Sequence, residues 1–355
     1  MHSIKAEWNA LAASMRCPTV FCMWEWIFTW WQHFGAGRNL RLFLIRRDSQ
    51  LKGILPLFSE RRFLSSDGRI GRVLGYCSAS DLFPDPLDIV SAPADARECA
   101  KAALNYLKTT ATDWDVLHLR FLTEDSELLR CAADGSRGDA ETARISGAPY
   151  ISITGSYDDY LRGLSGNERS KIGRSRRKLL GAQGVEYVDL GSEDTPQVLQ
   201  ALLELHEKRA GEKKIHSSFA HARVVAFHQA FLNRVDRSHV WLRGLRYQGA
   251  LIAVFYGYAL GGRLSYYQLG HDPAWATSSP GAVLLQETIR EAFERGFTEY
   301  NFLQGEEGFK FRWTSQIRRL HAVDVFNRSP LGRLSRWAIS ARRRLKSGAS
   351  VLLQR

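Results

Sequence analysis

The feature that most constrains the fold is a series of apolar segments separated by turns within residues 240–313. Three of these segments are rich in aromatic and β-branched side chains, which favour strands, and glycine-containing turns separate them. They cover residues 241–245, 250–260 and 263–269. The sequence therefore predicts an antiparallel meander of three strands.

A helix is expected to follow the third strand. Ser279 suits its cap, Pro280 suits its first turn and Gly296 ends it, while apolar side chains recur at helical spacing along one face. Residues 298–303 then predict a further strand. The start of such a helix carries unpaired N–H groups and partial positive charge, so it can hold a phosphate or pyrophosphate.

Length and composition indicate a globular chain with room for two domains. The 355 residues are 45% hydrophobic and 24% charged, which suits two domains of ordinary size. We expect an N-terminal half at residues 1–150, a C-terminal half at residues 151–327 and a basic amphipathic tail at residues 328–355.

Cysteine spacing and the N-terminus bear on the compartment. The five cysteines show neither Cys-x-x-Cys spacing nor nearby histidine clusters of metal-site form, so we expect reduced thiols and no metal. Residues 1–13 lack the continuous apolar core of a targeting segment. The tryptophan-rich run at residues 21–31 is shorter than the roughly 20 residues of a membrane span, and core packing is favoured for it. We predict a cytoplasmic protein.

The net charge of +12 is concentrated in two segments, because residues 328–355 contribute +8 and residues 167–180 contribute +5. The tail suits two roles: a helix lying on the anionic inner face of a membrane, or a solvated helix docked on the C-terminal half. The second segment fits a solvated helix face, a phosphate-steering surface or an RNA contact. Residues that form known nucleic-acid-binding motifs are absent from the sequence.

Acid–base chemistry needs a side chain that can accept a proton. The sequence offers several imidazole and carboxyl candidates: His206, Glu207, His271, Asp272 and Glu306. His206 lies on the apolar stripe of a predicted helix, which also suits a core or cleft-wall histidine. None of these candidates stands out from the residues alone.

Several short motifs, in order, resemble the GNAT-type acyltransferase domain of proteins associated with bacterial cellulose and exopolysaccharide synthesis, a group related to the FemABX aminoacyl transferases. The motifs are Tyr267-Gln268-Leu269-Gly270-His271-Asp272-Pro273, Ser279-Pro280-Gly281, Gly296-Phe297, Gly305-Glu306, and Phe309-Lys310 with Arg312-Trp313. Fainter likeness extends upstream to residue 20. The resemblance implies an α/β fold of two tandem GNAT-like halves, each with a mixed central sheet flanked by helices.

The resemblance also implies an activity. The C-terminal half would transfer an acyl group, acetyl first among them, from acetyl-CoA or another acyl-CoA to an amine or hydroxyl. The acceptor would be a sugar, nucleotide-sugar or envelope polysaccharide precursor, either a small molecule or lipid-linked. One alternative is a FemABX-like transferase that uses aminoacyl-tRNA, the single case in which nucleic acid is expected. The other is a degenerate GNAT accessory protein at the inner membrane face.

Roles for individual residues follow from the same resemblance. We expect the acyl donor to contact Leu269, Gly270, Ser279, Pro280 and Gly281. We expect the acceptor to contact Arg174, Arg177, Tyr267, Phe309 and Arg312. The expected catalytic residues are Lys310, Glu306, His206 and Asn301. Asn301 departs from the family, which has Asp there, and an amide cannot accept a proton.

Overall fold

We describe a computed structural model of the chain for residues 1–64, 70–79, 81–82, 84–134, 139–213, 219 and 221–337. Its contacts separate two compact units. Unit 1 consists of Met1–Cys17, Phe21–Ser146 and the described part of Arg319–Arg355, and unit 2 consists of Pro18–Val20 and Gly147–Arg318. The boundary expected near residue 150 and the separate tail from residue 328 stay predictions.

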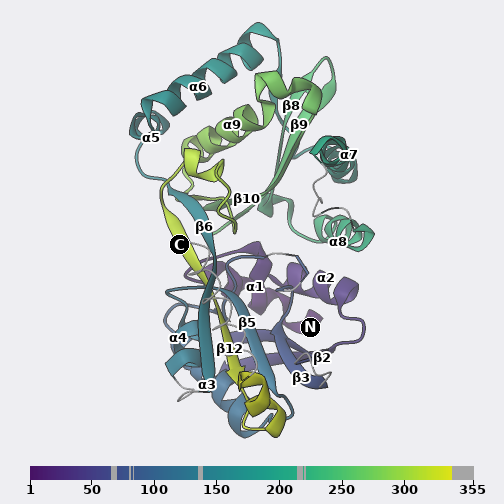
Figure 1. Ribbon diagram of the computed structural model, residues 1–355, viewed down its shortest axis with the longest axis vertical. Helices are drawn as coiled ribbons and strands as arrows, with labels where there is room; N and C mark the ends of the chain where they lie inside the picture. Colours follow the sequence, from purple (N-terminus) through teal and green to yellow (C-terminus); the bar gives the residue numbers. More distant parts are fainter. Residues whose placement is uncertain are drawn as a thin grey trace, which may run out of the picture. The chain divides into compact units, whose positions relative to one another are not determined.

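Unit 1 contains a mixed sheet with the strand order β1-β2-β3-β5-β12, to which β4 adds by pairing with β2. Its strands are β1 (Asn39–Arg47), β2 (Gln50–Phe63), β3 (Ile70–Tyr76), β4 (Val90–Ser91), β5 (Val116–Thr123) and β12 (Ile317–Phe326). Its helices are α1 (Lys5–Ser14), α2 (Trp24–Phe34), α3 (Ala96–Thr109) and α4 (Glu127–Asp134). In Figure 1, α3 and α4 cover one face of this sheet, and α1 and α2 cover the other.

The core of unit 1 includes the tryptophan-rich run. Trp24, Trp26 and Trp30 of α2 are at most 2% exposed. Trp30 still satisfies its indole N–H, which donates to Asp81 at 3.1 Å. Core packing expected from the helical spacing is therefore confirmed for Trp24 and Ile27, whereas Phe28 and Trp31 are only partly buried, and Trp26 and Trp30 enter the core instead.

Unit 2 contains a second mixed sheet, with the strand order β6-β11-β10-β9-β8-β7. Its strands are β6 (Ala140–Ser152), β7 (Glu186–Asp189), β8 (Val240–Tyr247), β9 (Ala250–Leu260), β10 (Arg263–His271) and β11 (Glu299–Asn301). Its helices are α5 (Tyr157–Gly163), α6 (Gly166–Arg176) continuing as the π-helical segment Arg177–Ala182, α7 (Thr195–Lys213), α8 (Ala222–Leu232) and α9 (Pro280–Glu294). Figure 1 shows α9 on one face of β8, β9 and β10 and α7 on the other.

The predicted meander is confirmed as β8, β9 and β10, and the predicted helix as α9. Two local details differ from the sequence-based expectation. The last strand ends at Asn301, because the Asn301 side chain accepts a hydrogen bond from the Leu303 N–H (2.9 Å) and Leu303 turns the chain with a φ of 57°. Ser279 stands at the N-cap of α9, but its side chain makes no capping hydrogen bond, and its backbone is left-handed.

The two units share one connectivity. In each, an antiparallel hairpin leads to a third strand, then to a helix and a parallel strand: β1, β2, β3, α3 and β5 in unit 1, and β8, β9, β10, α9 and β11 in unit 2. Each sheet gains one further strand. β12 follows β11 in the chain and pairs with β5, whereas β6 follows β5 in the chain and pairs with β11.

Three observations bear on other sequence-based expectations. Within the described residues, no helix is both long and apolar enough to cross a bilayer. In the same part of the chain, no three His, Cys, Asp or Glu side chains are grouped to hold a metal ion. The five cysteines, all described, form no disulfide.

A buried chain of hydrogen bonds joins α8 to the face of β9 and β10 that α7 covers. The Tyr258 hydroxyl donates to the Tyr256 hydroxyl at 2.6 Å. His228 lies between Tyr256, 3.4 Å from its Nδ1, and Tyr267, 3.1 Å from its Nε2. A neutral imidazole can serve both contacts, as donor at one nitrogen and acceptor at the other. Complete burial lowers the pKa of His228 to about 3.

The depressed pKa of His228 predicts a loss of stability in acid. An unfolded histidine binds a proton near pH 6.5, whereas the folded one stays neutral to about pH 3, so protons favour the unfolded state in between. From pH 7 to pH 5 this group alone should lower the free energy of unfolding by about 2 kcal/mol. Urea unfolding of the wild type and of His228→Phe at both values measures the difference.

The comparison with the variant is necessary because another group acts in the opposite direction. Burial raises the pKa of Asp88 to about 7, so that carboxyl favours the folded state as the pH falls from 7 towards 4. His228→Phe removes one contribution and leaves the other. If the difference in unfolding free energy between the two proteins is the same at both pH values, the assignment to His228 is wrong.

Candidate active site

A cavity of about 190 Å³ lies in unit 2, where the end of β10 meets the start of α9. Three segments of the chain form its wall: the second half of β10, the first two turns of α9, and the loop that follows β11. Its lining residues are Tyr266, Leu269, His271, Gly281, Ala282, Leu285, Phe309, Arg312 and Trp313.

The cavity exists because β10 separates from β11. The two strands pair in parallel only from Arg263 with Glu299 to Ser265 with Asn301. Beyond Ser265, β10 continues to His271 with β9 as its partner. Within the described residues, the β11 side of β10 therefore has an open edge, which can offer backbone N–H and C=O groups to a ligand.

An irregularity in β10 decides which side chains face the cavity. The pairing with β9 shifts between Tyr266 and Gln268, so Tyr267 is an extra residue in this strand. Tyr266 and Leu269 consequently line the same cavity although they are three residues apart. Tyr267 instead contacts His228 on the opposite face.

The first turn of α9 forms the opposite wall and requires a glycine. A Cβ atom at Gly281 would lie 3.1 Å from His271 Nδ1 and 3.3 Å from a methyl carbon of Leu269. The missing side chain thus lets the helix start approach the end of β10 closely. Because Gly281 and Ala282 line the cavity, the positive end of the helix borders it.

The charges around this helix start favour an anion. The first turn of α9 carries no acidic residue. Lys178 comes from the π-helical segment and reaches the preceding loop, with its Nζ 3.4 Å from the Thr277 carbonyl oxygen. Arg176 anchors the same segment to α9 through Glu287, with 2.6 Å between Nε and Oε1. The basic helix is therefore fixed beside the helix start.

The remaining wall comes from the loop after β11. Trp313 is buried, while Phe309 is 39% exposed at the edge of the cavity. The Arg312 guanidinium pairs with Glu168 of α6 at 2.9 Å and lowers the pKa of that carboxyl. This ion pair holds the polar end of Arg312 at the rim.

The buried side chain of Lys310 stabilises this loop. The residue is 3% exposed, and its Nζ donates to the carbonyl oxygens of Leu303, Gln304 and Gly305 at 3.3, 2.7 and 3.3 Å. It also pairs with Glu307 at 2.9 Å. Its ammonium group therefore closes the turn that ends β11 and does not line the cavity. A catalytic role for Lys310 stays a prediction, whereas its structural role is evident.

The other expected catalytic residues also lie outside the cavity lining. Glu306 is exposed, with its Oε1 2.9 Å from where a Cβ at Gly147 would lie. His206 contacts the Phe219 ring on the α7 side of the sheet. Asn301 is 2% exposed and holds the turn at Leu303. Proton transfer by any of these residues stays a prediction.

The expected ligand contacts divide between the cavity and other surfaces. Leu269, Gly281, Phe309 and Arg312 line the cavity, and Ser279 and Pro280 lead into it. Gly270 faces away, because a Cβ there would meet Leu202 and Leu205 of α7 at 3.0 Å. Tyr267 faces away too. Arg174 and Arg177 are exposed on the basic helix and do not line the cavity.

Sequence reasoning did not select four of the lining residues, which are Tyr266, Ala282, Leu285 and Trp313. Ala282 and Leu285 could have been found, because they follow Gly281 at helical spacing and share its side of α9. Tyr266 could not, because strict strand alternation places Tyr267 beside Leu269. His271 was considered as a proton acceptor, and the structure places it in the lining.

In unit 1, the position that corresponds to the start of α9 is the start of α3. Asp95 stands at the N-cap of α3, the counterpart of α9, and pairs with Arg47 at 3.2 Å and Lys52 at 3.9 Å. The chain between β3 and α3 also contributes Leu87 and Ile89 to a cavity of only about 30 Å³ beside Ala96. The Asp95 side chain makes no capping hydrogen bond, but a carboxylate at the N-cap disfavours an anionic donor there, so the donor site is expected in unit 2 alone.

Comparison with known proteins agrees with this location. Residues 166–311 match the family described as an acetyltransferase (GNAT) domain. The matched segment lies within unit 2 and contains seven of the nine residues that line the cavity, all except Arg312 and Trp313. This match to a GNAT acetyltransferase domain within unit 2 supports a transferase. Among proteins of curated function, no sequence matches this chain significantly.

Solved structures extend the likeness to both units. The crystal structure of FemX is 12% identical, with a TM-score of 0.66, and the match covers 95% of this chain and 99% of FemX. L-PGS from Bacillus licheniformis is 12% identical, with a TM-score of 0.54 and coverages of 89% and 94%. The C-terminal domain of a putative lysylphosphatidylglycerol synthetase from Agrobacterium fabrum is 11% identical, with a TM-score of 0.54 and coverages of 90% and 92%. The predicted α/β fold of two GNAT-like halves is confirmed.

The contacts of Lys310 predict that its main effect is on stability. Lys310→Met keeps much of the apolar stem but leaves three carbonyl oxygens without their donor. We expect the free energy of unfolding to fall by about 2 kcal/mol, measured by urea unfolding. Glu307→Gln is the matched control, because Glu307 is 57% exposed and should change stability little. A Lys310→Met protein with wild-type stability and strongly reduced turnover would instead identify Lys310 as a catalytic residue.

Proposed function

We propose that this protein transfers an acyl group from an acyl-CoA, acetyl-CoA first among them, to an amine or hydroxyl group. The proposal rests on one observation: the start of α9 and the edge of β10 border the same cavity. One wall is the positive start of α9, which suits the phosphates of the donor. The adjoining wall is the open edge of β10, which suits the thioester. The GNAT match supports the same chemistry.

The cavity supplies the groups that this reaction needs. The attacking nitrogen or oxygen forms a bond to the thioester carbonyl carbon, and the carbon–sulfur bond then breaks. Backbone N–H groups on the open edge of β10 can stabilise the negative charge that develops on the carbonyl oxygen. An imidazole accepts a proton near neutral pH, and His271 is the cavity-lining residue that carries one. It would take the proton of the nucleophile and pass it to the departing thiolate.

The class of acceptor rests on the family resemblance. A sugar, nucleotide-sugar or envelope precursor carries the required amine or hydroxyl group, whether it is a small molecule or attached to a lipid. Arg312 and Phe309 lie at the rim, where a charged and an aromatic side chain can contact such a group.

A second candidate is transfer from an aminoacyl-tRNA. The specific observation in its favour is the exposed basic surface of α6 and the π-helical segment. Its exposed cationic residues are Arg169, Lys171, Arg174, Arg177 and Lys178. Together they present more positive charge than one pyrophosphate requires, and the fold likeness to FemX points the same way. A degenerate accessory protein would bind neither acyl-CoA nor aminoacyl-tRNA.

Donor binding tests these candidates directly. We expect acetyl-CoA to bind the full chain in calorimetry and Gly281→Val to abolish the binding, because the added methyl groups meet His271 and Leu269. Gly163→Val is the matched control, since a Cβ at Gly163 meets nothing within 4 Å. Failure of acetyl-CoA, longer acyl-CoAs and free CoA to bind would exclude the first proposal. Binding of charged tRNA that Lys171→Glu with Arg174→Glu abolishes would then support the second.

The position of His271 predicts a kinetic signature. His271→Asn should lower kcat at least about 100-fold with little change in KM for the acyl-CoA. His206→Asn makes the same substitution at the other candidate histidine, on α7, and should retain most of the rate. The reverse result, with His206→Asn inactive and His271→Asn active, would transfer the role of proton acceptor to His206.

A further inference from the structure

Unit 1 exposes three large apolar side chains where β2 ends, where β3 begins and on the helix at residues 330–337. Phe63 is 71% exposed, Ile70 is 50% exposed and Trp337 is 73% exposed. Phe63 and Ile70 face each other across the β2–β3 ladder, so they form one cross-strand pair. Large apolar side chains gathered on a surface commonly mark a binding site.

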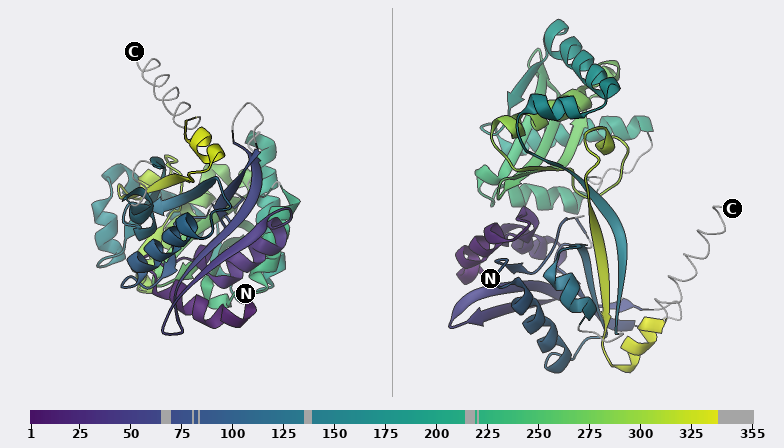
Figure 2. Two further views of the ribbon diagram at one scale, coloured as in Figure 1. Left: turned by 90° about the horizontal axis from the view of Figure 1, so that it is seen from below. Right: turned by 90° about the vertical axis from the view of Figure 1, so that its left-hand side faces the viewer.

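The strand ends and the helix border one groove. Arg61, Ile70 and Arg72 from the strands and Leu331 from the helix all line a groove of about 730 Å³ in unit 1. The helix directly follows β12 and is yellow in Figure 2. We call the surface made by Arg61, Phe63, Ile70, Arg333, Arg336 and Trp337 the arginine–aromatic surface.

The helix is attached by small residues, which directs its large residues outward. Ser329 Oγ donates to Asp115 Oδ1 at 2.6 Å, and Gly332 approaches the Asp115 backbone so closely that a Cβ would lie 2.9 Å from its carbonyl oxygen. Ser335 is 1% exposed and donates to the Leu331 carbonyl oxygen. Arg333, Arg336 and Trp337 are exposed. The outer side of this helix is therefore both basic and aromatic.

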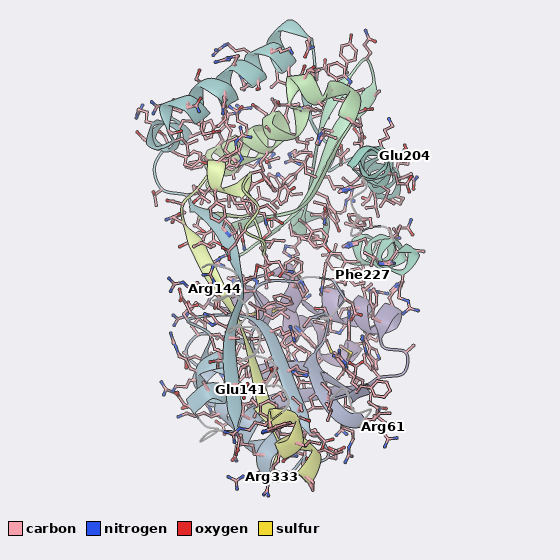
Figure 3. The ribbon with its side chains drawn as sticks, in the orientation of Figure 1. Arg61, Glu141, Arg144, Glu204, Phe227 and Arg333 are labelled. Carbon is pink, nitrogen blue, oxygen red and sulfur yellow. The ribbon has the colours of Figure 1, made fainter. Side chains whose placement is uncertain are left out.

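The charge of the arginine–aromatic surface is positive. Figure 3 labels Arg61 and Arg333, which both project from unit 1, and neither forms an ion pair with another described residue. Arg336 has a partner, Asp139, at 3.5 Å. The sequence that continues from Trp337, residues 338–355, carries five basic residues and no acidic one. The surface thus combines exposed apolar groups with an excess of arginine.

We propose that the arginine–aromatic surface docks unit 1 on an anionic lipid bilayer. Tryptophan and phenylalanine suit the boundary between head groups and acyl chains, and arginine binds lipid phosphates. An acidic protein partner would satisfy the arginines but gives no reason for three exposed apolar side chains of this size. The inference does not depend on the acyl donor, because it concerns unit 1 and needs no catalytic turnover.

Sedimentation of the full chain with lipid vesicles tests the proposal. We expect binding to phosphatidylcholine vesicles that contain phosphatidylglycerol, little binding to pure phosphatidylcholine, and weaker binding as salt is added. Trp337→Ala and Phe63→Ser should each weaken binding about fivefold while the salt dependence persists. Arg333→Glu with Arg336→Glu should weaken it at least about tenfold.

A matched charge reversal distinguishes this surface from general attraction. Lys171→Glu with Arg174→Glu makes the same change in net charge, at the same spacing, on the exposed face of α6 in unit 2. This control should bind vesicles nearly as well as the wild type. Equal losses in the two double variants, or a loss in the control alone, would overturn the assignment. So would the absence of wild-type binding at low salt.

Discussion

The separation of β10 from β11 is the constraint on which the candidate site depends. Parallel pairing is lost after Ser265 because β11 ends at Asn301, where the Asn301 amide and the left-handed Leu303 turn the chain away. Lys310 then holds that turn through three carbonyl oxygens. A buried ammonium group is costly unless its donors are satisfied, and the donors of Lys310 are satisfied by three carbonyl oxygens and the Glu307 carboxylate of this single loop. The hydrogen bonds of Lys310 therefore stabilise the turn that leads the chain away from the edge of β10.

Local sequence signals predicted the elements of unit 2 well, because these signals act over a few residues. The β8–β10 meander and the start and end of α9 followed from apolar runs, turns and the Pro280 position. The side of the sheet that each tyrosine faces could not be predicted in the same way. Strict alternation places Tyr267 with Leu269, but one extra residue in the pairing with β9 puts Tyr266 there instead. A bulge of this kind depends on the partner strand, which the local pattern does not contain.

The same limit applies to Lys310, for which the family resemblance implied a catalytic role. Its ammonium group points to carbonyl oxygens five to seven residues earlier in the chain. Those carbonyls converge only because the backbone turns left-handed at Leu303 and also adopts a positive φ at Gly305. Residue type and spacing identify such a lysine as unusual. They do not distinguish a lysine that stabilises a loop from a lysine that takes part in catalysis.

The two units share one connectivity but differ in the charges at the start of the helix that follows the third strand. In unit 1 the helix after the third strand has Asp95 at its N-cap, and this carboxylate pairs with Arg47 and Lys52. In unit 2 the equivalent position is Ser279. Lys178 reaches the loop before it from a helix that is itself fixed by the pair between Arg176 and the fully buried Glu287. Because Glu287 neutralises Arg176, that arginine serves the packing of α6 on α9, and its exposed neighbours keep their charge. The basic run of α6 is thus a structural anchor on its inner side and carries exposed positive charge on its outer side, which is the arrangement that an anionic donor arriving at the start of α9 would meet.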